Sequence, residues 1–72
     1  MSWEYRVMKV DGQHAIHEVH YEGDDRAMPK TYSIHPAYPR GEDLADLHED
    51  IQRYLEALTL PVLIPDDFPR SE

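Results

Sequence analysis

The stretch "WEYRVMKVDGQHAIHEVHY", residues 3–21, contains two runs rich in Trp, Tyr, Val, Ile and His that an Asp-Gly pair separates. Aromatic and β-branched residues favour strands, and Asp-Gly is a strong signal for a tight turn between two paired strands. These residues therefore predict a β-hairpin with strands over residues 3–10 and 13–22. The hairpin decides the fold class, because the rest of the chain must extend or cover its sheet.

The register of this hairpin depends on the length of its loop. A two-residue loop pairs Val10 with Gln13 and leaves apolar and charged side chains mixed on each face. A three-residue loop with Gly12 in the left-handed conformation pairs Lys9 with Gln13. Because a one-residue slip reverses every side chain, we expect the need for a buried face to select the three-residue loop. The predicted inner face is Trp3, Tyr5, Val7, Ala15, Val19 and Tyr21, with His17 among them.

The other face of the hairpin has no helix available to cover it. Uncovered apolar side chains on a sheet are typical of contact with a second copy or another protein. We expect five residues to form this interaction face: Met8, Val10, His14, Ile16 and His20.

The chain after the hairpin predicts one more strand and one helix. Residues 28–35, "MPKTYSIH", predict a weaker strand that begins at or just after Pro29, since proline donates no hydrogen bond to a ladder. Residues 43–58, "DLADLHEDIQRYLEAL", predict a helix with Asp43 as its N-cap. Its apolar side chains follow helical spacing and should face the sheet: Leu44, Leu47, Ile51, Tyr54, Leu55 and Leu58.

The C-terminal part of the chain is apolar and then polar. Residues 60–65, "LPVLIP", should lie extended against the sheet or the helix and could add a short extra strand. Residues 65–72 are expected to fray, with Phe68 as a late anchor. The predicted architecture is α+β: one domain over residues 1–64, with a three-stranded antiparallel sheet and one helix packed on one face.

Composition excludes several classes of function. The 72 residues carry a formal charge of −8 and no cysteine. Because phosphate contacts dominate nucleic-acid affinity, we expect no nucleic-acid partner, and no attraction to anionic lipid. The absence of cysteine rules out disulfides and thiol catalysis and fits a reducing cytoplasm. The start of the chain has no continuous apolar block, so we expect neither a signal peptide nor a membrane anchor.

Three histidines within the hairpin raise the question of a metal site. Strand alternation sends His14 and His20 to one face and His17 to the other, and His14 and His20 are about 20 Å apart. We therefore expect no metal, no cofactor and no catalytic residues, and a half-buried, hydrogen-bonded ring for His17. The acidic pairs should serve turns or solvated helix faces: Asp24-Asp25, Glu49-Asp50 and Asp66-Asp67. The alternative is a small metal- or ligand-binding enzyme that uses His35, His14 or His20 with a nearby carboxylate.

The strand order and the start of the helix resemble the HicB-like antitoxin fold. The residues that carry this likeness are Gly41, Glu42, Asp43, Leu44, Ala45, Asp46 and Leu47, at the place where that family opens its helix. The chain is also similar to short bacterial proteins of unassigned function, through Tyr5-Arg6-Val7, residues 15–19 and residues 55–63. The HicB resemblance implies a dimeric, protein-binding module that occupies a small basic toxin. The expected function is therefore a small acidic protein-binding module with a homodimer or a basic protein as partner, and not an enzyme.

Overall fold

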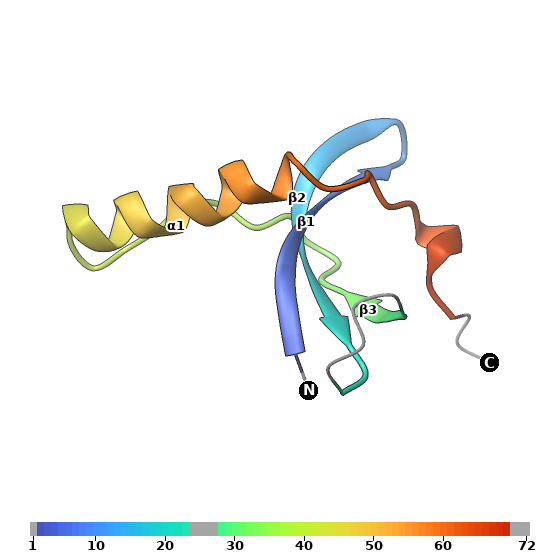
Figure 1. Cartoon of the computed structure of the whole chain (residues 1–72). Helices are drawn as coiled ribbons and strands as arrows, with labels where there is room; N and C mark the ends of the chain where they lie inside the picture. Colours follow the sequence, from blue (N-terminus) through green and yellow to red (C-terminus); the bar gives the residue numbers. More distant parts are fainter. Residues whose placement is uncertain (1, 24–27, 70–72) are drawn as a thin grey trace.

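The computed structural model describes residues 2–23 and 28–69 of the chain. Three strands form one antiparallel sheet in the order β1-β2-β3, namely β1 (Ser2–Val10), β2 (Gln13–Tyr21) and β3 (Pro29–Tyr32). Helix α1 (Leu44–Ala57) and the 3₁₀ turn η1 (Pro65–Asp67) follow. Figure 1 shows α1 reaching out from the strands on one side and η1 lying on the other side. The predicted α+β architecture is confirmed.

The hairpin turn is shorter than expected. Val10 pairs with Gln13, so the loop consists of Asp11 and Gly12 alone, and the expected three-residue loop is wrong. Both residues have positive φ angles, 51° for Asp11 and 80° for Gly12. These angles are typical of a type I′ turn, whose twist matches the twist of the two strands it connects. Turn geometry therefore decided the register.

This register changes which side chains share a face. Met8 lies opposite Ala15 and Glu4 opposite Val19, so Met8 and Val19 are on one face, together with Tyr21. Strand alternation places Trp3, Tyr5 and Val7 on the other face. The predicted inner face, which joined Trp3, Tyr5 and Val7 to Val19 and Tyr21, is therefore wrong.

The most deeply buried face of the sheet is covered by the C-terminal segment. Met8, Val19 and Tyr21 are fully buried, and Phe68 packs into the same cluster, with its ring centroid 4.8 Å from that of Tyr32. Phe68 thus acts as the predicted anchor. The expected fraying is wrong for residues 65–68, because apolar burial holds this segment on the sheet. Residues 70–72 lie outside the described part of the chain.

Residues 61–63 run along the outer edge of β1. The Lys9 amide donates to the Leu63 carbonyl at 2.9 Å, and the Leu63 amide donates to the Val7 carbonyl at 3.0 Å. This contact is a single parallel bridge, so the extra strand did not form in the described residues. The buried Arg6 guanidinium secures the segment by donating from Nη2 to the Pro61 carbonyl at 2.7 Å. Its Nη1 donates to the Tyr21 hydroxyl at 3.1 Å.

Helix α1 begins as its sequence predicts. The Asp43 side chain accepts a hydrogen bond from the Asp46 amide at 2.8 Å, which satisfies one free donor of the first turn. The helix packs against the Tyr5 and Val7 face of the sheet, where the rings of Tyr5 and Tyr54 are 4.6 Å apart. The buried helix residues are Asp50 and Ala57. The other face of the helix points away from the sheet.

Candidate functional site

The hairpin histidines do not gather at one point. His17 lies on the buried face, and its Nδ1 donates to the Ser33 carbonyl at 2.8 Å. His14 and His20 lie on the opposite face of β2, so the predicted alternation and the hydrogen bond of the His17 ring are confirmed. The expectation that this ring is half-buried is wrong, because His17 is buried. Within residues 2–23 and 28–69, no three His, Cys, Asp or Glu side chains are grouped so that they could hold a metal ion.

The other two histidines lie in different places. His35 lines a small cavity of about 140 Å³ with Glu18, Tyr38 and Arg40. His48 lies on the exposed surface of α1. The structure therefore brings His35 near one carboxylate, Glu18, and leaves the remaining imidazoles apart.

The expected interaction face is not one surface. Met8 and Val10 point to the side that the C-terminal segment covers, and Met8 is fully buried. His14, Ile16 and His20 point to the side on which α1 packs. The two-residue turn is the reason, because it shifts β2 by one residue relative to the expected pairing.

A buried carboxylate lies where α1 meets the sheet. Asp50 is only 7% exposed, so the expectation that it serves a solvated helix face is wrong. Its Oδ1 accepts a hydrogen bond from the Tyr5 hydroxyl at 3.1 Å, and its Oδ2 accepts one from the Arg40 amide at 3.1 Å. Arg53 Nη1 lies 3.8 Å from Oδ1. Asp50 thus connects the helix, β1 and the segment that precedes the helix. The Asp24-Asp25 pair lies outside the described residues.

Burial around this carboxylate shifts the titration of two phenols. Burial is the main cause that raises the pKa of Tyr54 to about 12, and the charges of Tyr5 and Asp50 raise it further. Burial also raises the pKa of Tyr5, with the hydrogen bond to Asp50 as the second cause. Both effects favour the neutral phenol. The two phenols therefore stay neutral to higher pH than a free phenol does, and the hydrogen bond from Tyr5 to Asp50 suits a structural role.

The outward surface of α1 carries a row of apolar side chains. We call Leu44, Ile51, Leu55 and Leu58 the outer stripe; their exposed fractions are 82%, 41%, 53% and 65%. Spacings of seven, four and three residues keep these positions on one side of a helix. The expectation that all apolar helix positions face the sheet is therefore wrong for these four. Asp50, Tyr54 and Ala57 form the inward row, at a different angle around the helix.

Two larger cavities flank α1. One, of about 550 Å³, lies between the helix and the segment before it and is lined by charged side chains such as Arg40, Glu42 and Glu49. The other, of about 620 Å³, lies between the start of β1 and the end of α1. We call it the Trp3 groove, and its lining residues are Trp3, Glu4, Tyr5, Arg53, Glu56, Ala57, Thr59 and Leu60.

The sequence did not predict the cluster of Asp50, Tyr5 and Tyr54, and it did not predict the Trp3 groove. For Asp50 a signal existed, since Leu47, Asp50, Tyr54 and Ala57 also follow helical spacing and form a second candidate for the inward face. For the groove there was none, because Trp3 was expected in the core, whereas the structure leaves it 44% exposed.

Comparisons with known proteins find no relative of this chain. No protein-family model matches the chain, and neither a curated protein nor a solved structure matches it. In the described ranges, no helix combines the length and the apolar content that crossing a bilayer requires.

Proposed function

We propose that this chain is an acidic protein-binding module that holds a basic amphipathic helix of a partner protein against the outer stripe of α1. The observation that carries the proposal is the exposure of Leu44, Ile51, Leu55 and Leu58 in one row. A contiguous apolar row on a helix that already packs on its own sheet by another face is typical of an interaction surface.

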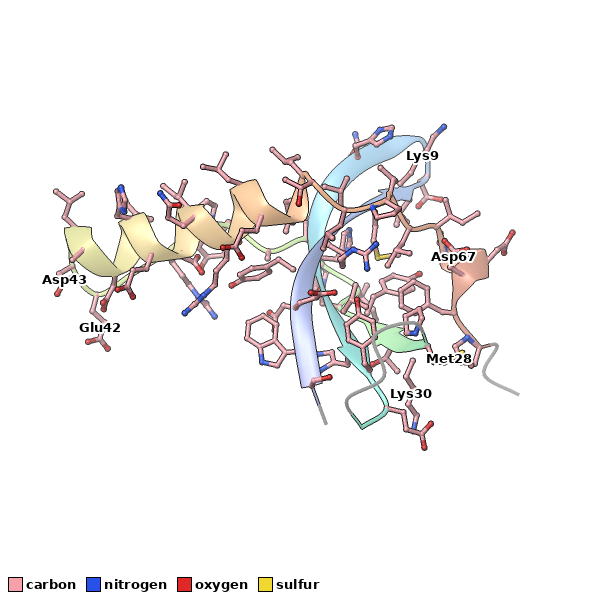
Figure 2. All side chains as sticks on the ribbon, in the orientation of Figure 1. Lys9, Met28, Lys30, Glu42, Asp43 and Asp67 are labelled. Atoms are coloured by element: carbon pink, nitrogen blue, oxygen red, sulfur yellow. The ribbon has the colours of Figure 1, made fainter. Side chains whose placement is uncertain are left out.

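The negative charge of the chain favours a basic partner. Glu49 and Glu56 are both exposed and lie seven residues apart, so they share one side of α1, and at about 3.6 residues per turn that side is away from the stripe. Figure 2 shows Glu42 and Asp43 at the end of the helix farthest from the strands. With a chain charge of −8, the acidic start of α1 and the chain as a whole attract Lys and Arg side chains and repel acidic ones.

The same charges disfavour a second copy of the chain as the occupant. Pairing two copies through α1 would bring two charges of −8 together. The basic toxin that the HicB resemblance implies has the chemistry that this surface would bind.

A titration with designed peptides tests the proposal. The probe is a synthetic helical peptide with leucine at its seam and lysine on its flanks, added to the isotope-labelled full chain. We expect saturable changes in the backbone amide signals of residues 44–58. Ile51→Gln and Leu55→Gln should each weaken binding about tenfold, because each removes a central apolar contact. Ile34→Gln is the matched control, since Ile34 is 85% exposed but lies outside α1.

Three outcomes would overturn the proposal. A peptide with glutamine in place of its leucines could bind equally well, which would reduce the effect to charge attraction alone. Ile51→Gln could bind the lysine peptide as tightly as the unchanged chain. Sedimentation equilibrium could reveal a dimer that Leu55→Gln dissociates, which would make a second copy the occupant.

A further inference from the structure

The Trp3 groove lies on a different part of α1 from the outer stripe. Its helix residues are Arg53, Glu56 and Ala57, none of which belongs to the stripe. Its opposite wall is the start of β1, with Trp3 and Tyr5. A ligand in this groove would therefore leave the outer stripe free.

The indole of Trp3 is held in place and yet presented to the groove. Its ring meets the ring of Tyr5 edge to face at a centroid distance of 5.2 Å, and Tyr5 in turn packs against Tyr54. Trp3 is nevertheless 44% exposed. A supported but exposed tryptophan face attracts cations, because the face of the ring carries negative charge density.

The backbone of β1 offers a second means of recognition. Leu63 bonds to the outer edge of β1 through the Val7 carbonyl and the Lys9 amide. Alternation directs the backbone groups of Trp3 and Tyr5 to the same edge. Among the described residues, no main-chain group bonds to them on that edge. An extended peptide could add there as a further strand, in line with residues 61–63.

We infer that the Trp3 groove binds a short extended peptide segment through one arginine or lysine side chain. The cation would lie against the Trp3 indole and near the exposed Glu56 carboxylate, while the peptide backbone pairs with Trp3 and Tyr5. Arg53 is the opposing charge in the groove, and its guanidinium lies 3.8 Å from the Asp50 carboxylate. The net charge of −8 favours a cationic guest over an anionic one.

Trp3 is the single tryptophan of the chain, so its fluorescence reports on the groove alone. The probe is a capped five-residue peptide of β-branched residues with arginine at its centre, added to the full chain. The matched probe carries citrulline in place of arginine, which keeps the shape and removes the charge. We expect a saturable change in Trp3 fluorescence with the arginine peptide and about fivefold weaker binding of the citrulline peptide.

Two variants on the groove wall sharpen the test. Glu56→Gln should weaken binding of the arginine peptide about threefold, and Arg53→Gln should strengthen it, because one removes an attractive charge and the other a repulsive one. Leu55→Gln on the outer stripe should bind it as the unchanged chain does, which separates this site from the proposed function. Equal binding of the two peptides would overturn the inference, as would no effect of Glu56→Gln. The inference would also be overturned if the arginine peptide left the backbone amide signals of residues 3–5 unchanged.

Discussion

The hydroxyl of Tyr5 on β1 donates a hydrogen bond to the carboxylate of Asp50 on α1, with 3.1 Å between Oη and Oδ1. The two residues are 45 positions apart in the chain, with β2 and β3 between them, so this bond connects the hairpin to an element distant in sequence. The second carboxylate oxygen accepts the Arg40 amide, which fixes the segment before the helix as well. One buried carboxylate thus orients α1 on the sheet and leaves its outer stripe exposed.

Replacing Asp50 should destabilise the fold. Asp50→Ala leaves the Tyr5 hydroxyl and the Arg40 amide without their acceptor, and we expect a loss of about 2 kcal/mol in the free energy of unfolding. Asp50→Asn keeps one carbonyl oxygen and should lose about half as much. Urea denaturation of the full chain measures both. Glu49→Ala is the control, because Glu49 is the neighbouring exposed acid, and an equal loss there would show that the buried bonds contribute nothing.

Stability should fall at high pH because of Tyr54. Burial raises its pKa from 10.0 to about 12 in the folded protein, so above pH 10 the unfolded chain loses this proton first. The contribution of the buried Tyr54 phenol to the free energy of unfolding is therefore complete below pH 10, and it declines as the pH rises toward about 12. Urea denaturation across this range, with phenolate absorbance in parallel, should show a smaller decline in Tyr54→Phe. Tyr38→Phe, at an exposed ring, is the control; an unchanged decline in Tyr54→Phe would contradict the prediction.

The hairpin turn should respond in opposite directions to two changes. Gly12 has a φ of 80°, so Gly12→Ala forces a side chain into the left-handed region and should cost about 1 kcal/mol. Asp11→Asn should stabilise by a few tenths of a kcal/mol, because Asn-Gly is the most favoured pair for a type I′ turn. Thermal denaturation measures both changes. If Gly12→Ala were neutral, the positive φ angle would not be needed in solution.

The C-terminal anchor should contribute more than its position near the chain end implies. Phe68→Ala empties a buried site beside Tyr32 and should cost about 3 kcal/mol, whereas Phe68→Leu should cost about 1 kcal/mol. Hydrogen exchange at the Leu63 amide should also speed up, since residues 63–68 cover the core together. Ile34→Ala, at an exposed apolar residue, should change stability by less than about 0.5 kcal/mol. An equally small effect of Phe68→Ala would show that Phe68 does not hold the C-terminal segment on the sheet.

The elements themselves could be predicted from the sequence, because each has a local cause. Asp11-Gly12 makes the turn, Asp43 caps the helix, and the β-branched and aromatic runs form the strands. The register of the hairpin could not be predicted, because the two candidate loops differ by one residue and neither gives one wholly apolar face. The two-residue turn places Trp3 and Val19 on opposite faces of the sheet. It also divides the residues of the expected interaction face between the two faces.

The sequence by itself determined the α+β class, the hairpin, the start of the helix and the anchoring by Phe68, since these depend on neighbours in the chain or on plain hydrophobicity. Only the tertiary structure decided which row of α1 faces the sheet. Burial of apolar area has no direction, so the leucine row and the row containing Asp50 were both available. In the structure the row containing Asp50 faces the sheet, where Asp50 accepts the directional hydrogen bond from Tyr5. The apolar side chains of the other row remain exposed and form the surface that we propose binds a partner.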